Sequence, residues 1–244
     1  MPTIERSDIQ NPVSLRPRAA RGHGPGGERA IIATELVKDF PVENGSRRVL
    51  DGINFRVGPG DRMGVLGRNG AGKSTLIKLL AGLLRPTSGH VHRGLYMSWP
   101  LALGSGFEGE TTGYDNMRFI SRIYRTPFKQ MLEFVTDFTE LGRYIYEPMR
   151  FYSDGMRARL SLGISLAVDF ECLLIDEIIM VGDHRFQEKC QREIFDNRRH
   201  CGMILAVHAM DVVETYCNQV LVLKDGRGRV FDDVKLACAI YATL

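Results

Sequence analysis

Residues 67 to 74 read Gly67-Arg68-Asn69-Gly70-Ala71-Gly72-Lys73-Ser74, and this stretch decides the fold of the chain. The spacing is that of a phosphate-binding loop, in which glycines allow successive backbone N–H groups to turn inward around an anion. Lys73 can reach the terminal phosphates of a nucleotide, and the hydroxyl of Ser74 can bind magnesium. The residues predicted to bind a nucleoside triphosphate here are Gly67, Asn69, Gly70, Ala71, Gly72, Lys73, Ser74 and Thr75.

The sequence on either side of the loop fits this interpretation. Residues 62–66 read as a short buried strand, and residues 74–81 read as a helix with an apolar face. A helix that starts at the loop adds the positive end of its dipole to the phosphate site. The alternative is a glycine-rich turn that carries lysine and serine by chance, and it leaves both flanking elements unexplained.

Two carboxylates end a second apolar segment further along the chain. Residues 171–175 read as a strand, and Asp176 and Glu177 follow it directly. An aspartate at the end of a strand beside a phosphate loop is well placed to hold magnesium. The second carboxylate can polarise an attacking water. The alternative, a strand capped by surface acids, is common where no phosphate loop is present.

Other strand patterns lie on both sides of these two motifs. Residues 31–37 and 48–57 read as strands, the second with alternating apolar and polar positions. The loop between them contains Phe40, an aromatic residue that can stack on a base, whereas a lone phenylalanine is more often part of a core. Strand patterns return at 172–175, 203–207 and 220–223, and the last is followed by the turn signal Lys224-Asp225-Gly226.

Residues 100–168 differ from the strand-rich parts of the chain. They open with a glycine-rich stretch at 103–109 and continue with helical patterning. One apolar helical face is made by Phe119, Ile120, Ile123 and Tyr124, and another by Met131, Leu132, Phe134, Val135 and Phe138. The pattern predicts a helical lobe inserted into a strand-rich domain.

The composition excludes several classes of protein. The chain has 244 residues, of which 44% are hydrophobic, so it can bury one large core or two joined lobes. Its five cysteines show neither C-x-x-C spacing nor an even count, which favours reduced thiols in packed positions. No apolar run approaches the roughly 18 residues of a membrane span, and the N-terminus lacks the hydrophobic core of a signal peptide. We therefore expect a soluble, cytoplasmic protein that reaches a membrane only through a partner.

The net charge of +3 is concentrated at the N-terminus. Residues 1–30 carry five arginines against three acidic residues, a local net charge of +2. The same segment contains four glycines and four prolines, so it has too little apolar surface to fold alone. We expect a flexible basic tail that is solvated rather than bound to anionic lipid. Because the rest of the chain is almost neutral, we expect no nucleic-acid partner.

The stretch Tyr152-Ser153-Asp154-Gly155-Met156-Arg157-Ala158-Arg159-Leu160-Ser161-Leu162 resembles the signature motif of ABC-type ATPases. A serine and a polar residue precede a glycine that opens a helix, shortly upstream of the acidic strand. Residues 31 to about 235 match the order of that family's motifs. The resemblance implies an α/β fold, a P-loop ABC ATPase cassette over 31–244. This cassette has a RecA-like core, an antiparallel β-subdomain and an inserted α-helical subdomain at roughly 100–168.

The same resemblance implies roles for single residues. Phe40 falls where such cassettes carry a base-stacking aromatic, and Asp183 falls where they have the aspartate that follows the catalytic carboxylate. His208 occupies the place of their switch histidine, although a histidine after a buried strand is usually structural. The implied catalytic residues are Glu177, His208 and Lys73, and the implied magnesium ligands are Ser74 and Asp176.

The resemblance also implies a head-to-tail homodimer. ATP would lie between residues 67–75 of one subunit and Ser153, Asp154 and Gly155 of the other. Many signature motifs have glycine at the position of Asp154, which here places a negative charge near the γ-phosphate. We expect this charge to weaken dimer closure unless Arg157 or the N-terminus of the helix offsets it.

A finer resemblance is to the ATPase subunits of capsular-polysaccharide exporters, a branch of the ABC-2 transporters. It rests on the segments 98–101, 106–109, 112–116, 152–160 and 181–186. It implies an ATP-hydrolysing subunit that energises export of capsular or related cell-surface polysaccharide across the bacterial inner membrane. The implied partners are integral membrane permease subunits and a wider export complex, which would hold the chain at the cytoplasmic face. Because the sequence stops at Leu244, we expect it to lack the carbohydrate-binding domain of some O-antigen exporters.

Other functions remain open at this point. One is the ATPase of another ABC-2 exporter, for O-antigen, teichoic acid or a drug. A second is a soluble ABC ATPase that acts in translation or DNA repair, although such proteins usually carry two cassettes or a long coiled coil. A third is a GTPase-like switch, which requires an Asn-Lys-x-Asp guanine motif that this sequence lacks.

The segment before the helical lobe departs from the family pattern. Typical cassettes have a glutamine near residue 99 that contacts magnesium, whereas here Ser98 and Trp99 occupy the segment and Gln130 lies too far along. Glu108 is a candidate substitute. We expect Trp99 and Phe107 to form a partner-docking patch, because the glycines that follow favour a flexible loop. The alternative is ordinary core packing.

Overall fold

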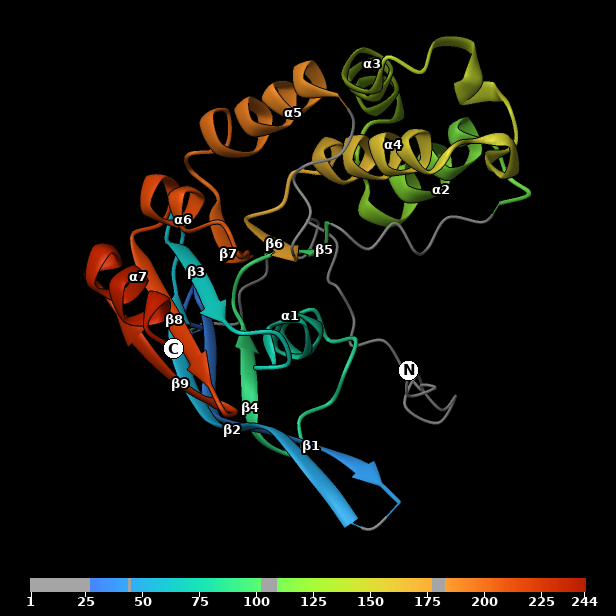
Figure 1. Ribbon diagram of the computed structural model, residues 1–244. Coiled ribbons are helices and arrows are strands. Elements are labelled where there is room, and N and C mark those ends of the chain that lie inside the picture. Colours follow the sequence, from blue (N-terminus) through green and yellow to red (C-terminus); the bar gives the residue numbers. More distant parts are fainter. Residues whose placement is uncertain (1–26, 44, 102–108, 177–182) are drawn as a thin grey trace.

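The strand that precedes the phosphate loop lies inside a six-stranded sheet (Figure 1). The computed structural model describes residues 27–43, 45–101, 109–176 and 183–244. Within these residues the strand order is β5-β6-β7-β3-β8-β9, and all neighbours are parallel except β8 and β9. The strands are β3 (Arg62–Gly67), β5 (Met97–Pro100), β6 (Cys172–Asp176), β7 (Gly202–Ala206), β8 (Gln219–Lys224) and β9 (Arg227–Phe231).

Both faces of this sheet are buried, because successive side chains alternate between two hydrophobic cores. On β3, Val65 belongs to one core and Leu66 to the other; on β6, Leu174 and Ile175 divide in the same way. The first core includes the apolar side of α1 (Lys73–Leu80), and the second includes helices on the opposite face. The strands predicted at 62–66, 172–175, 203–207 and 220–223 are confirmed to within one residue at each end.

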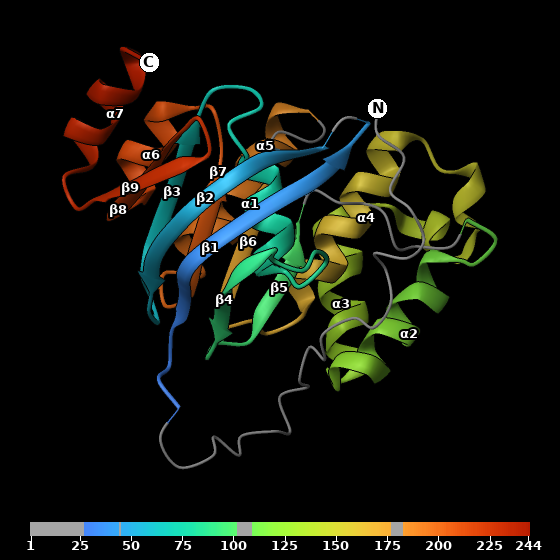
Figure 2. The same ribbon diagram turned by 90° about the horizontal axis from the view of Figure 1, so that it is seen from below.

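A second, antiparallel sheet packs on the same core as α1 (Figure 2). Its order is β2-β1-β4, and its strands are β1 (Ile31–Val42), β2 (Gly45–Val57) and β4 (Ser88–Arg93). Arg93 links this sheet to the end of α1, because its guanidinium donates to the carbonyls of Leu79 (2.7 Å) and Leu80 (2.8 Å). These bonds satisfy carbonyls that the last turn of a helix leaves unpaired.

The hairpin of β1 and β2 is longer than the sequence predicts. Phe40, expected in the connecting loop, lies within β1 opposite Arg47. Charged residues pair across this outer part, as in the 3.0 Å contact between Arg48 and Asp39. The ammonium of Lys38 lies 4.9 Å from the centre of the Phe40 ring. Cross-strand pairs of this kind stabilise a solvent-exposed hairpin, whose polar composition resembles that of a loop.

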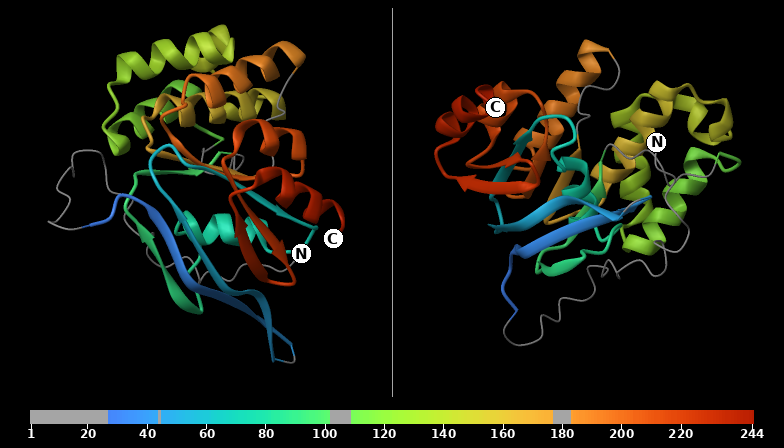
Figure 3. Two further views of the ribbon diagram at one scale, coloured as in Figure 1. Left: turned by 90° about the vertical axis from the view of Figure 1, so that its left-hand side faces the viewer. Right: turned by 60° about the horizontal axis from the view of Figure 1, so that its bottom comes forward.

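Three helices from the middle of the chain form a lobe beside the central sheet (Figures 1 and 3). They are α2 (Gly113–Tyr124), α3 (Phe128–Thr139) and α4 (Asp154–Ala167), with short 3-10 turns η2 (Gly142–Tyr146) and η3 (Met149–Phe151) between the last two. The lobe lies within the predicted region 100–168. The other helices are α5 (His184–Gln191), which continues into a π-helical turn η4 (Arg192–Asp196), α6 (Met210–Tyr216) and α7 (Val234–Ala242). None of the described helices has the length and apolar character needed to cross a membrane.

The N-terminal edge of the packed domain lies slightly before Ile31. Glu28 forms an ion pair with Arg56, and Arg29 forms one with Glu171, both at 2.7 Å. These contacts attach the last residues of the predicted basic tail to the two sheets. Residues 1–26 lie outside the described residues.

Trp99 packs against the core where β5 meets the helical lobe, and the expectation that it forms a partner-docking patch rather than core is wrong. Its half-buried indole N–H donates to the hydroxyl of Ser165 on α4 at 2.8 Å. The ring also meets Tyr124 and Phe170 edge-on, with ring centres 5.1 and 5.3 Å away. The glycine-rich stretch begins only after β5, so it gives no freedom to a residue inside that strand. Phe107 lies outside the described residues.

We expect Trp99→Ala to destabilise the protein by about 2–3 kcal/mol, because a half-buried ring and its contacts at the lobe joint are lost. Trp99→Phe keeps an aromatic ring but loses the bond to Ser165, and should cost about 1 kcal/mol. Urea unfolding followed by circular dichroism measures both. An alanine variant with wild-type stability would show that the ring contributes nothing to this joint.

Candidate active site

The phosphate loop has a backbone shape that only glycine adopts easily at two positions. Gly70 and Gly72 have φ angles of 83° and 106°, and Gly72 stands immediately before the first residue of α1. A Cβ atom on Gly72 would lie 2.8 Å from Cδ2 of Leu50 on β2. At Gly67, a Cβ atom would lie 2.8 Å from the carbonyl oxygen of Leu223. Glycine is therefore required in this loop for two reasons: the positive φ angles at Gly70 and Gly72, and the lack of space for a Cβ atom at Gly67 and Gly72.

Lys73 is buried at the first position of α1, where its ammonium turns back into the loop. Its Nζ donates to the carbonyl oxygen of Gly67 at 2.6 Å and to that of Arg68 at 3.4 Å. The positive end of the helix and the ammonium thus lie together, and both favour an anion such as a phosphate. The contact of Lys73 with the terminal phosphates stays a prediction.

Ser74 and Asp176, the two predicted magnesium ligands, are brought together from different elements. The Ser74 hydroxyl at the start of α1 donates to Oδ1 of Asp176 at the end of β6, at 3.2 Å. Hydroxyl and carboxylate oxygens are hard donors, and Mg²⁺ is usually held by one or two such protein ligands plus phosphate and water. This pair of oxygens therefore fits the ion. Glu177 follows directly in the sequence but lies outside the described residues.

His208 lies just after β7, at the same edge of the sheet as the ends of β3 and β6. Its imidazole is exposed, and its Nδ1 is 3.5 Å from the hydroxyl of Tyr241 on α7. The carboxyl ends of parallel strands form one edge of an open sheet, where ligands usually bind. Gly67, Asp176 and His208 thus lie at or just beyond the same edge of the sheet, and their joint action on a nucleotide stays a prediction.

The signature residues belong to the helical lobe rather than to this edge. Ser153 caps α4, and its hydroxyl accepts a hydrogen bond from the backbone N–H of Met156 at 3.2 Å. The Asp154 side chain is fully exposed and 3.8 Å from Arg157. Gly155 is also exposed, and a Cβ atom there would meet only the Ser153 hydroxyl, at 3.9 Å. The N-terminus of α4 is therefore an open, hydrogen-bond-donating surface.

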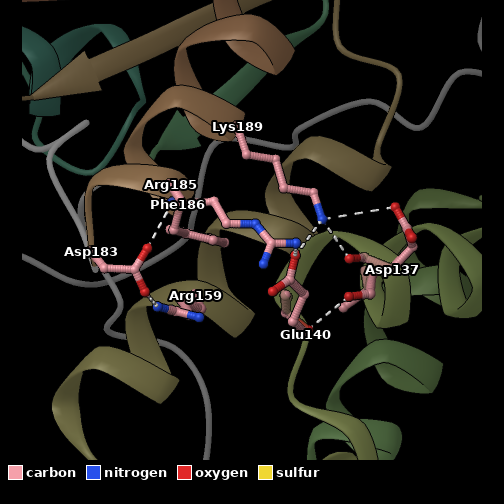
Figure 4. Close-up of polar contacts among 9 residues, drawn as sticks. Asp137, Glu140, Arg159, Asp183, Arg185, Phe186 and Lys189 are labelled. Carbon is pink, nitrogen blue, oxygen red and sulfur yellow. Dashed lines mark hydrogen bonds and ion pairs between the residues drawn. The ribbon is translucent and has the colours of Figure 1, made fainter.

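Asp183 is engaged within its own subunit. One carboxylate oxygen caps α5 by accepting from the backbone N–H of Phe186, and the other accepts from Arg159 on α4, both at 2.9 Å (Figure 4). These two bonds, the backbone one foremost, hold the pKa of Asp183 below its usual value. Arg159 is a site neighbour that the sequence reasoning missed. Phe40, the predicted base-stacking residue, is half-buried on the outer part of β1.

Sequence comparisons match most of this chain to known proteins. The family model "ABC transporter" matches residues 50–180. The capsule polysaccharide export ATP-binding protein CtrD of Neisseria meningitidis is 45% identical over 88% of this chain and 100% of its own length. The ATP-binding protein BexA of Haemophilus influenzae is 44% identical, over 86% and 97% of the two chains.

Solved structures share the fold. An ATP-binding subunit of an ABC transporter superposes with a TM-score of 0.73 at 20% identity, covering 86% of this chain and 94% of that one. The ATP-binding cassette MJ0796, solved as a dimer bound to ADP and phosphate, gives 0.70 at 19% identity, covering 82% and 97%. These likenesses confirm the predicted fold class.

We expect Gly72→Ala to destabilise the protein by about 2 kcal/mol or more and to remove ATP binding. The methyl group disfavours the φ angle of 106° and enters the space of Leu50. Gly155→Ala is a matched control for stability, because its methyl group makes only an ordinary 3.9 Å contact with the Ser153 hydroxyl. Denaturant unfolding and titration with labelled ATP measure both properties. A Gly72 variant as stable as the control would contradict the described shape of the loop.

Proposed function

This chain belongs to the ABC transporter family, and from that premise we propose that it is the ATP-hydrolysing subunit of a polysaccharide exporter. Its substrate class is capsular or related cell-surface polysaccharide, carried across the bacterial inner membrane. The observation that carries the proposal is the 45% identity to a capsule polysaccharide export protein, which extends over that protein's whole length. A complete phosphate loop, with an aspartate at its side, supports the ATPase part of the proposal.

Hydrolysis depends mainly on positioning and on stabilising charge. In our proposal Lys73 and His208 contact the γ-phosphate, and Glu177 polarises the attacking water. Ser74 and Asp176 would hold Mg²⁺, which neutralises charge that develops on the phosphate oxygens. The bond that breaks joins the β- and γ-phosphates of ATP, and the products are ADP and phosphate.

Each chain carries only half of a complete ATP site, so we infer that a homodimer forms the working unit. The open N-terminus of α4 would reach the phosphates held by the partner subunit's loop. The dimeric form of the cassette MJ0796, which shares the fold, supports this arrangement. Asp154 places a carboxylate at that contact, and its exposed ion pair with Arg157 offsets the charge only slightly. We therefore expect the isolated chain to dimerise weakly.

The helical lobe is the proposed docking surface for the membrane permease subunits. Five large apolar side chains are exposed on it: Phe119, Ile123, Tyr144, Tyr146 and Phe151. Phe119 (62% exposed) and Ile123 (45%) lie one turn apart on α2, so they present one continuous strip. Exposed apolar side chains that lie close together are typical of interaction sites. Such docking would place the chain at the cytoplasmic face of the inner membrane, within a wider export complex.

We expect Glu177→Gln to bind ATP normally and to hydrolyse it very slowly. The amide cannot polarise water, while the groups that hold the phosphates are unchanged, so a closed ATP-bound dimer should accumulate. Phosphate release and analytical ultracentrifugation measure the two effects. Lys73→Ala is the contrasting variant, because it should lose affinity for ATP. Wild-type turnover in Glu177→Gln would remove this residue from the mechanism.

We expect the double variant Phe119→Ala/Ile123→Ala to keep its stability within about 0.5 kcal/mol, since both side chains are exposed. Co-purification with the permease should fall sharply, because anchoring apolar residues often contribute about 2 kcal/mol or more each at an interface. Leu236→Ala on α7 is the matched control, since Leu236 is also half-exposed but lies outside the lobe. Equal recovery of permease with all three proteins would place the docking surface elsewhere.

A further inference from the structure

Arg159 connects the signature helix to α5 across 24 residues of sequence (Figure 4). It lies in the second turn of α4, the helix that begins with the signature motif. Its Nη2 atom is 2.9 Å from Oδ2 of Asp183, and its side chain is 21% exposed. Hydrogen bonds between a guanidinium and a carboxylate are among the stronger polar contacts in proteins.

The same guanidinium also lies over an aromatic ring. Its central carbon is 4.5 Å from the ring centre of Phe186, which is almost completely buried. The Phe186 ring in turn meets Phe138 of α3 at 5.3 Å. Arg159 is therefore fixed by a carboxylate on one side and a ring on another; Asp183 caps α5, and Phe186 lies in its first turn.

A second set of contacts joins α5 to the end of α3. The ammonium of Lys189 donates to the carbonyl oxygen of Asp137 at 2.6 Å and to the carboxylate of Glu140 at 3.2 Å. Arg185 lies 3.6 Å from the same carboxylate. Lys189 foremost holds the pKa of Glu140 below its usual value, and Arg185 and Arg159 contribute. Helix α5 is thus attached to both α3 and α4, although it follows strand β6 in the chain.

We propose that Arg159 is a positioning residue for ATP hydrolysis. It holds the signature helix α4 in a fixed position relative to the N-terminal end of α5. Only six residues separate Asp183 from Asp176, the predicted magnesium ligand at the end of β6. Arg159 therefore ties the signature helix to a residue that follows Asp176 closely in the sequence. This inference rests on the proposed ATPase function and names a residue that acts through Asp183 rather than on the nucleotide.

Two single variants and their combination test the link. Asp183→Asn keeps the cap of α5, because asparagine caps helices about as well as aspartate, but it removes the charge that Arg159 meets. Arg159→Met keeps an apolar chain over Phe186 and removes the hydrogen bond. Because misplaced groups slow catalysis steeply, we expect kcat for ATP to fall by about tenfold or more in each single variant. KM and the melting temperature should stay near their wild-type values, and the double variant should be no slower than the worse single one.

Arg185→Met is the matched control, because it removes another cation from α5. The Arg185 side chain is 85% exposed and pairs with Glu140, not with Asp183. It should keep wild-type kcat. The proposal is overturned if both single variants stay within about twofold of wild-type kcat, or if their losses multiply in the double variant. If kcat falls and the melting temperature also falls well below that of the wild type, the proposal is overturned in favour of a purely structural role. A wild-type chain without ATPase activity would overturn the proposed function as well, so the two failures are distinguishable.

Discussion

The sharp turn of the backbone at Gly72 is the constraint on which the nucleotide site depends. The chain leaves β3 at Gly67 and must reverse within the loop to enter α1 at Lys73, and the φ angle of 106° at Gly72 allows this last turn. Leu50 of β2 fills the space behind the turn, so the antiparallel sheet supports the loop from outside. As a result Lys73 is buried toward the loop, while Ser74 faces the carboxylate of Asp176.

Among the contacts that attach the helical lobe to the rest of the domain, two differ in kind. At one, the Trp99 ring on β5 packs against Tyr124 of α2 and bonds to Ser165 of α4. At the other, Arg159 near the beginning of α4 pairs with Asp183 of α5. The first contact combines aromatic packing with one neutral hydrogen bond, whereas the second depends on charge and on the orientation of a planar group. The beginning of α4, which carries the signature motif, is therefore held by the more directional of the two.

Features that depend on neighbouring residues in the sequence could be predicted from it, and features that depend on distant packing could not. The phosphate loop follows from glycine spacing, and the turn at Asp225 and Gly226 follows from two residues that tolerate positive φ, 49° and 79° here. The position of Trp99 could not be predicted, because its burial is decided by helices that begin more than ten residues later. The pairing of Arg159 likewise depends on how α4 and α5 meet in space, and the outer half of the hairpin is too polar to indicate a strand.

Trp99 is the only tryptophan in the chain, and it lies at the joint between sheet and lobe. Indole emission responds to the hydrogen bond on its nitrogen and to rings in contact with it, here the Ser165 hydroxyl and the rings of Tyr124 and Phe170. Every one of these neighbours comes from α2, α4 or the segment that follows α4. The unlabelled protein therefore carries its own optical reporter, whose intensity and colour respond to any change in these contacts between sheet and lobe.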